Sequence, residues 1–444
     1  MASKPSNLIY GVNDKPPVLA TLLLGVQHIF VMSSTIILPV VLIREIGGTF
    51  AEIKSVVSFS MIAAGLGTVL QALGKGIVGS GYLVPNLCGP SYLAVSLQAA
   101  WLGGLPLMRG MTIIAGIFEA AFSRIVHKIK FLFPTEITGL VVLMVAVKLI
   151  PLGASKFVGI VIPGDAIKPL YVVVSGLTLM TMAGLNIWSK GKIKLYCVLI
   201  GMVVGYALSV LTGILTLENF DYVFKDPLFA MPGIKGTYLQ LKFSWQLVIP
   251  FLIVSLCGSL KSFGNLITAQ KINTEGWKEP DMKNVENGLF ADSLSVISSG
   301  VLGGMATDTS ASNVGMSLAT GATSRMIAFA AGILFIFLGF FPKIASIITI
   351  MPSPVMGAML IFVASFMVLA GFQIILSRKL NTRRIFIIGV SFIFGISVDI
   401  LPGLYASIPD CLRSVFGSSL TFSTMLAIIL NQIFSIGARR EAVE

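Results

Sequence analysis

Long apolar runs, separated by short polar or glycine- and proline-rich breaks, dominate this sequence. Cutting the chain at those breaks predicts fourteen apolar segments, near residues 18–43, 53–74, 82–99, 107–123, 132–150, 170–188, 193–213, 245–269, 287–303, 305–323, 325–342, 353–375, 383–402 and 420–438. A helix needs about 20 apolar residues to cross a bilayer. The pattern therefore predicts an all-α polytopic membrane protein, with a single membrane domain over residues 1–444.

The composition agrees with a chain that lies mostly in lipid. Hydrophobic residues make up 55% of the chain and charged residues only 11%, whereas soluble proteins are roughly 25% charged. The first 17 residues are polar, and the apolar run after them is too long for the core of a cleavable signal peptide. The cysteines, Cys88, Cys197, Cys257 and Cys411, form no C-x-x-C pair, so we expect neither a disulfide framework nor a zinc site.

The net charge of +12 is explained by membrane topology better than by nucleic-acid binding. If the N-terminus is cytoplasmic, basic residues gather in the inner loops, within 124–130, 190–194 and 378–384, and in the C-terminal tail. This is the positive-inside asymmetry, and an even number of crossings then places both termini in the cytoplasm. We expect the inner or plasma membrane, the lipid bilayer as a partner, and no nucleic acid.

The chain resembles itself at about half its length. SYLAVSL (91–97) aligns with SNVGMSL (312–318), and FPTEITGLVVL (133–143) aligns with MPSPVMGAMLI (351–361) at a nearly equal offset. An offset of seven segments, an odd number, would invert one repeat relative to the other. We therefore expect two inverted repeats, over about 1–213 and 214–444, with a site at their interface as in many secondary transporters.

The third and tenth segments are poor continuous helices. VPNLCGPSYLA and GGMATDTSASNVG carry proline, glycine and small polar residues where a helix should continue. Irregular backbone at membrane depth is tolerated only where it is buried in protein or lines a cavity. We predict two half-helices, each preceded by an extended segment, with N-termini that face one another and favour negative charge. The alternative is a pair of kinked helices packed on small residues.

Lys261 stands in the apolar stretch SLCGSLKSFGN (255–265). On a helix it shares a small, polar face with Gly258, Gly264 and Asn265. An ionisable residue inside a membrane indicates a functional site by default, so we expect Lys261 to contact the substrate or to take part in coupling. The alternative is a structural ion pair, with Asp308 or Asp292 as the partner.

Other polar residues within the apolar segments are candidates for binding or coupling. His28, next to Gln27, could bind a substrate, relay a proton, or join a polar network between helices. The acids Asp292 and Glu119 could each form a proton or sodium site or pair with a cation. The sequence has no H-E-x-x-H motif, no Walker phosphate loop and no convincing nucleophile–base pair. An enzyme or an ATP-driven pump is therefore disfavoured, and no cofactor is expected beyond a coupling proton or sodium ion.

Several stretches together resemble the nucleobase–ascorbate transporter family, also called the nucleobase:cation symporter-2 or uracil/xanthine permease family. They are YGVNDKPP (10–17) followed by LLLGVQHIFVM (22–32), NGLFADSLSVISSGVLGG (287–304), and SNVGMSLATG (312–321). The resemblance implies fourteen helices in two inverted seven-helix repeats, with core and gate domains and broken third and tenth helices. It also implies proton- or sodium-driven symport, often by a homodimer, with the substrate held between the broken segments and the eighth helix.

The resemblance places a substrate site and a coupling site on particular residues. Those expected to bind substrate are Gln27, Ser91, Tyr92, Lys261, Asn265, Ala311, Ser312 and Asn313, and those expected to couple or gate are His28, Asp292 and Asp308.

Two positions depart from the family pattern. Where the eighth helix usually has Glu-x-x-Gly, this chain has Lys261, and the tenth-segment signature begins with Ser312 instead of Glu or Gln. An ammonium group only donates hydrogen bonds, whereas a carboxylate only accepts them. Our hypothesis is that Lys261 neutralises an anionic ligand, such as a urate or xanthine monoanion or a non-purine organic anion. If Lys261 pairs with Asp308, the site is neutral overall and still accepts a base.

Two rival classes of protein remain. An anion exchanger or channel of the related sulfate-transporter architecture would share this fold, but that group typically carries a large soluble domain after the helices. A membrane enzyme or receptor would need paired acids or a metal cluster near the cytoplasmic face, which the sequence does not contain.

Overall fold

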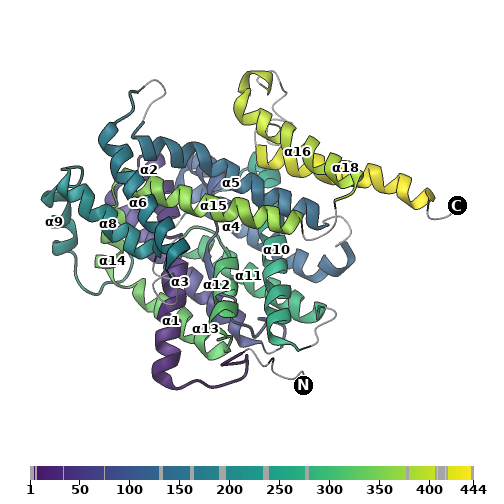
Figure 1. Ribbon diagram of the computed structural model, residues 1–444, viewed down its shortest axis with the longest axis horizontal. Helices are drawn as coiled ribbons and strands as arrows, with labels where there is room; N and C mark the ends of the chain where they lie inside the picture. Colours follow the sequence, from purple (N-terminus) through teal and green to yellow (C-terminus); the bar gives the residue numbers. More distant parts are fainter. Residues whose placement is uncertain are drawn as a thin grey trace.

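The computed structural model describes residues 5, 8–33, 35–74, 76–129, 134–160, 165–189, 197–233, 240–275, 280–376, 380–405, 408, 416 and 419–441. Cys411 and parts of the basic loops that predict the topology, such as residues 190–194 and 378–379, lie outside this part of the chain. Within it, every apolar segment that the hydrophobic pattern predicts contains a helix, and the long helices pack together around two short strands (Figure 1).

The helices follow the predicted segments closely, because each is a run of apolar residues bounded by polar residues, glycine or proline. In the first half of the chain they are α1 (Val18–Ser33), α2 (Ile37–Glu45), α3 (Phe50–Leu73), α4 (Leu93–Ile129), α5 (Thr135–Val158), α6 (Pro169–Trp188) and α8 (Cys197–Leu211). In the second half they are α9 (Leu217–Lys225), α10 (Trp245–Asn273), α11 (Met282–Leu302), α12 (Ala311–Thr320), α13 (Arg325–Leu338), α14 (Pro342–Thr349), α15 (Ser353–Ile375), α16 (Thr382–Ile400) and α18 (Ser419–Glu441).

Five stretches of the described chain are long and apolar enough to cross a membrane, namely Val18–Glu45, Phe50–Leu73, Pro90–Ile125, Pro169–Trp188 and Trp245–Asn273. Large apolar side chains also face outward, including Met180 (72% exposed) and Trp188 (81% exposed) on α6. Apolar surface of this kind indicates contact with lipid. The chain is a multi-pass membrane protein, and fourteen crossings in two inverted repeats stay a prediction.

The long helix α4 is interrupted, which separates two of the predicted segments. Gly103 has φ −150° and ψ 16°, and Gly104 has φ 71° and ψ −172°. A side chain at Gly104 would be strained, because L-residues other than glycine rarely adopt a positive φ. The apolar segments predicted near 82–99 and 107–123 are therefore two helical pieces joined at these glycines.

The third and tenth segments begin as extended chain, as the proline- and glycine-rich pattern predicts. Strands β1 (Asn86–Cys88) and β2 (Thr307–Thr309) pair antiparallel, with Leu87 opposite Asp308, and both are completely buried. The 3-10 turn η1 (Pro90–Tyr92) leads from β1 into α4, and β2 leads into α12. Because the strands are antiparallel, the two helices leave from opposite ends of the pair.

Four of the described helices pack against the strands and position the polar residues described below. Helix α3 packs against both strands, α1 packs against β1, and α10 and α11 pack against β2. In Figure 1, α10, α11 and α12 lie near one another in the centre of the molecule, whereas α16 and α18 run side by side at one edge. The irregular backbone of the third and tenth segments is thus enclosed by protein, which membrane depth requires.

Two short helices in the described part of the chain lie outside the apolar segments that the sequence predicts. Helix α9 lies in the polar connection after α8, and α14 follows α13. They contact each other, and Asp226, just after α9, accepts hydrogen bonds from Ser346 of α14 and from Lys54 of α3, the latter at 2.7 Å. Helices of 8 to 9 residues are too short to be stable alone, so tertiary contacts determine them.

Helices α5 and α15 cross at a pair of glycines. A methyl group built on Gly371 would lie 2.9 Å from the Leu143 backbone nitrogen and 3.0 Å from the Gly139 carbonyl oxygen. One built on Gly139 would lie 2.8 Å from the Gly371 carbonyl oxygen. Small residues allow close backbone approach, which is a main source of stability between helices in lipid.

We expect Gly371→Ala to destabilise the protein by about 1–3 kcal/mol, because the added methyl overpacks this crossing. Thermal unfolding of the purified protein in detergent measures the effect. Gly389→Ala is the matched control, since a methyl on Gly389 of α16 would have no atom within 4 Å. Equal melting temperatures for the two variants would contradict the close crossing.

Candidate functional site

One turn of α10, residues 259–262, contacts three buried carboxyl groups. The Lys261 ammonium forms an ion pair with Asp308 Oδ1 of β2 at 2.7 Å. The Asp308 side chain is 1% exposed, whereas that of Lys261 is 14% exposed, so the cation is the accessible member of the pair. The Ser91 hydroxyl donates a longer hydrogen bond of 3.4 Å to Asp308 Oδ2. The ion-pair alternative, with Asp308 as the partner of Lys261, is therefore what the structure contains.

The second carboxyl group, Asp292 of α11, is held by two neutral donors. Asn86 Nδ2 of β1 donates to Asp292 Oδ1 at 2.5 Å, and the Ser262 hydroxyl of α10 donates to Asp292 Oδ2. Asp292 is 1% exposed. A buried charge without hydrogen bonds is costly, and these donors satisfy both oxygens. Asp292 therefore joins β1, α10 and α11 at one point.

The third carboxyl group, Glu119 of α4, is also 1% exposed. The Ser259 hydroxyl of α10 donates to Glu119 Oε1 at 2.9 Å. Four residues earlier on α10, Ser255 donates to the Ala115 carbonyl oxygen of α4 at 2.8 Å. These two hydroxyl groups fix the packing of α4 on α10 beside the ion pair.

Asn265, one turn after Lys261, binds the end of β2. Its Nδ2 donates to Thr309 Oγ1 at 2.8 Å and to the Thr309 carbonyl oxygen at 3.2 Å. Thr309 Oγ1 in turn donates to Ser262 Oγ at 2.8 Å. The Asn265 side chain is thus used in holding β2 against α10, and its predicted contact with substrate stays a prediction.

His28 of α1 and Asn313 of α12, both predicted site residues, contact each other. His28 Nδ1 lies 2.7 Å from Asn313 Oδ1, and Asn313 Nδ2 donates to Ser310 Oγ at 2.9 Å. Ser310 also caps α12, accepting from the Asn313 backbone at 3.2 Å, as serine does at helix N-termini. All three side chains are buried. These hydrogen bonds form a polar network between α1 and α12. Such a network is one of the alternatives that the sequence left open for His28.

Two open faces flank this buried network. On α10, Lys261 is partly exposed and Gly264 and Thr268 are exposed, at a spacing of three and four residues. On α12, which packs against α10, the exposed positions are Ala311, Ser312 and Gly315. Gly264, Ala311 and Gly315 have little or no side chain, so they leave space beside Lys261 and Ser312. A ligand that lay here would meet the Lys261 ammonium and the Ser312 hydroxyl.

Gln27 and Tyr92, two further predicted substrate residues, differ in the contacts that their side chains make. The Gln27 side chain, on α1, is 8% exposed, and within the described chain its amide makes no hydrogen bond, so its donors and acceptor are available. Tyr92 is fully buried, packed between Gly89 and Gly258, whose added methyl groups would lie 3.0 Å and 3.4 Å from its ring. The Tyr92 ring thus fills the space between the end of β1 and α10, and its predicted contact with substrate stays a prediction.

The structure also shows residues that the sequence analysis did not single out. Ser262, Asn86 and Thr309 complete the network around Asp292. Ser262 adjoins Lys261, and Asn86 of β1 lies directly opposite Thr309 of β2 in the register. The signal for Asn86 and Thr309 in the sequence was a polar residue inside a broken apolar segment, whereas Ser262 lies in the continuous helix α10. Among the described residues, no cluster of His, Cys, Asp or Glu suits a metal ion.

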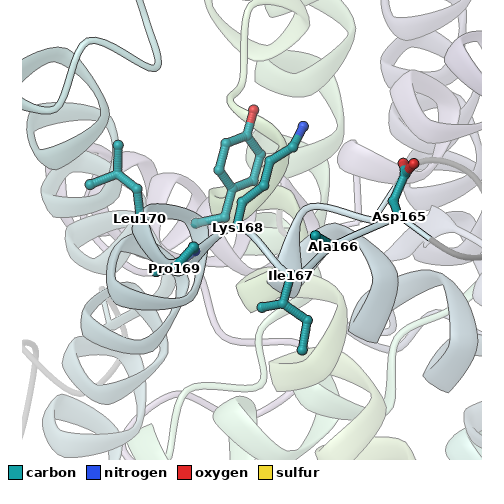
Figure 2. A pocket seen from close by; sticks show the side chains of 7 residues that line it. Asp165, Ala166, Ile167, Lys168, Pro169 and Leu170 are labelled. Atoms are coloured by element: carbon teal, nitrogen blue, oxygen red, sulfur yellow. The ribbon is translucent and has the colours of Figure 1, made fainter.

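A cavity at the start of α6 is lined by none of these residues. It has a volume of about 570 Å³ and is lined by the consecutive residues 165–171, at the start of α6 (Figure 2). Residues 165–170 are exposed, and the Lys168 ammonium lies 5.1 Å from the centre of the Tyr171 ring. A hollow formed by one connecting segment, without convergent polar groups, lacks the features of a ligand site.

The fold is similar to that of a known membrane transporter. The transmembrane domain of the cyanobacterium bicarbonate transporter BicA superimposes with a TM-score of 0.59 and 12% sequence identity. The match covers 95% of this chain and 99% of that domain. At this identity the likeness concerns the fold alone.

Sequence comparison is more specific. The xanthine permease XanP of Escherichia coli is 27% identical over 449 residues, which cover 97% of this chain and 95% of XanP. The uric acid permease PucJ of Bacillus subtilis is 26% identical over 429 residues, which cover 94% and 93% of the two chains. The Permease family model Xan_ur_permease matches residues 19–404, from α1 to the turn after α16. The chain therefore belongs to this permease family, and it is a transport protein and not an enzyme.

Proposed function

We propose that this protein is a secondary transporter of oxidised purines, with xanthine and urate as the first candidates, in symport with a proton. The names of its relatives support the substrate class, since XanP is a xanthine permease and PucJ a uric acid permease. The hydrogen-bonding groups of the site also suit an oxidised purine. Sodium as the coupling ion is the alternative to a proton.

The proposal rests on one observation: the accessible Lys261 ammonium forms an ion pair with the buried Asp308 carboxylate. The Lys261 ammonium has three hydrogen-bond donors and uses one of them for Asp308. The other two are available to a ligand on the open face of α10. Xanthine and urate carry several carbonyl oxygens, which accept such hydrogen bonds. Because Asp308 compensates the Lys261 charge, a neutral base is accepted as well as a monoanion.

The neighbouring groups suit the rest of a purine. A base edge presents both N–H donors and carbonyl acceptors, so its site needs groups of both kinds. The Gln27 amide offers a donor and an acceptor, and the Ser312 hydroxyl offers either. We assign these side chains, with Lys261, to the substrate, and we assign Ser91, Tyr92, Asn265 and the buried His28–Asn313 contact to positioning.

The larger arrangement follows the same proposal. We expect two inverted repeats that meet at the strand pair, a gate that moves against the core, a homodimer, and both termini in the cytoplasm. The main alternative is a transporter or exchanger of a non-purine organic anion. It is favoured by one observation, which is that a lysine stands where the family pattern has a carboxylate.

Thermal stabilisation of the purified protein tests the substrate class. A ligand that binds only the folded state stabilises it by about 2.7 kcal/mol at one hundred times its dissociation constant. We expect xanthine and urate to raise the melting temperature with concentration, and uracil, ascorbate, simple carboxylates and sulfonates to do so weakly. Stabilisation by the carboxylates or sulfonates alone would replace purines by the organic-anion alternative.

A variant pair shows whether the stabilisation depends on the ion pair. In Lys261→Met/Asp308→Asn both charges are removed together, and we expect the stabilisation by xanthine and urate to be lost. The matched control is Lys225→Met/Asp221→Asn, which removes an exposed lysine–aspartate pair from α9. Ligand stabilisation that survives in the first variant would remove Lys261 from the substrate site.

A further inference from the structure

Glu119 is a buried acid for which the proposed substrate site has no use. It lies on α4 and is 1% exposed, and the Ser259 hydroxyl donates to it at 2.9 Å. Within the described chain it has no basic partner, since the ion pairs there involve other acids. A buried carboxylate without a cation is expensive to keep ionised.

A second carboxyl group lies next to Glu119. Their donors, Ser259 and Ser262, are three residues apart on α10, and α4 packs against α11, so the two carboxyl groups lie close together. The Glu119 and Asp292 side chains interact, and within the described chain Asp292 has neutral donors but no ion pair. An ionised carboxylate only accepts hydrogen bonds, so two of them in contact repel. A hydrogen bond between them requires that one of the two carries a proton.

The remaining charged and titratable groups around this carboxyl pair do not offset its charge. Asp308 on β2 adds a third acid, Tyr92 on η1 is uncharged, and the single cation, Lys261 on α10, pairs with Asp308. If every acid were ionised, these groups would carry a net charge of two negative units in an enclosed site. Binding one proton halves that charge.

We infer that Glu119 and Asp292 together bind the proton that crosses the membrane with the substrate. The inference rests on the proposed function and names a proton site for it. A proton adds to one carboxylate, which becomes a neutral acid and donates its O–H to the other; on release the proton leaves and both carboxylates are again ionised. No other atom or electron is transferred.

The coupling to substrate runs through one helical turn. Ser259 donates to Glu119, Ser262 donates to Asp292, and Lys261 lies between them in the sequence of α10. A proton in the carboxyl pair changes both the charge near Lys261 and the hydrogen bonds that hold this turn. Helix α10 therefore carries both the accessible Lys261 ammonium and the hydroxyl groups that bind the two buried carboxyl groups.

The test uses Glu119→Gln, in which the amide keeps the shape of the protonated acid but cannot release a proton. The full-length protein is reconstituted into proteoliposomes with radiolabelled xanthine as the probe. Two quantities are measured: counterflow exchange, which needs no net proton movement, and accumulation driven by a pH gradient. One pH unit supports at most about tenfold accumulation for one proton per neutral substrate.

We expect the wild-type protein to exchange xanthine and to accumulate it with the pH gradient. We expect Glu119→Gln to retain exchange within about twofold while its accumulation ratio falls to about one. Accumulation that persists in Glu119→Gln would overturn the inference alone. Wild-type exchange without gradient-driven accumulation would overturn the proton symport of the proposed function, and absence of any xanthine exchange would overturn its substrate.

A second variant covers the case in which Glu119→Gln does not fold. In Ser259→Ala the ionised form of Glu119 loses a donor, so the protonated pair is favoured. The pH at which accumulation is half-maximal should then rise by about one unit. Ser255→Ala is the matched control, because that hydroxyl joins the same two helices through the Ala115 carbonyl oxygen and touches no carboxyl group. An unchanged pH profile in Ser259→Ala would overturn the inference.

Discussion

Lys261→Met is expected to abolish xanthine uptake and to lower the melting temperature of the protein. Removing the ammonium leaves Asp308 buried and unpaired, with the Ser91 hydroxyl as a distant donor. Breaking a buried ion pair in this way costs about 3–5 kcal/mol. The stability is measured by thermal unfolding in detergent, and uptake by radiolabelled xanthine in proteoliposomes.

The double variant separates the two effects of Lys261. In Lys261→Met/Asp308→Asn no buried charge remains without a partner, so we expect most of the stability to return, because a pair of neutral groups can replace a buried ion pair at little cost. Uptake should stay lost, since the donor to the substrate is missing. A double variant that transports like the wild type would show that the ion pair is structural only.

Arg109→Met is the second large effect that we expect, and it acts on stability. Arg109 lies on α4 and is 4% exposed. Its Nε donates to the Gly300 carbonyl oxygen at 3.0 Å, and its Nη2 donates to the Val301 carbonyl oxygen at 2.6 Å. These are among the last carbonyl groups of α11, which have no partner within their own helix. A cation at a helix C-terminus is also favoured by the helix dipole.

Methionine preserves the apolar stem of Arg109 but leaves both carbonyl groups without this donor. Hydrogen bonds from a charged group contribute about 1.5–3 kcal/mol each, so we expect a loss of roughly 3–5 kcal/mol. Thermal unfolding measures it. Arg124→Met is the comparison on the same helix, since Arg124 makes only long hydrogen bonds of 3.3 Å. A smaller loss at Arg109 than at Arg124 would contradict the capping role.

In the broken third and tenth segments, the local sequence predicts the extended backbone but not how the two segments pair. Pro85, Gly89 and Pro90 exclude a continuous helix whatever surrounds them, so the extended segment before η1 was predictable. The glycines and small polar residues of GGMATDTS (303–310) favour the same before α12. The antiparallel pairing of the two segments, with Leu87 opposite Asp308, was not predictable. The register depends on two segments of the chain that are more than 200 residues apart in the sequence. That register delivers Asp308 to the turn that carries Lys261.

The short helices and the buried donors show the same limit. Nothing in the local sequence of α9 or α14 distinguishes them from loops, since helices of this length depend on the elements they contact. Likewise Ser259 and Ser262 are ordinary small residues in the sequence of α10. They acquire a role only because α4 and α11 bring Glu119 and Asp292 against them.

The class of protein, the positions of its long helices, the two breaks and the resemblance to a permease family could all be read from the amino-acid sequence. Most of these follow from hydrophobic runs and helix-breaking residues, which act over a few residues at a time. Asp308 and Asp292 were both candidate partners for Lys261. The choice between them needed the folded structure, because an ion pair depends on the packing of distant elements. Strand β2 brings Asp308 to 2.7 Å from the ammonium, while Asn86 and Ser262 donate hydrogen bonds to Asp292.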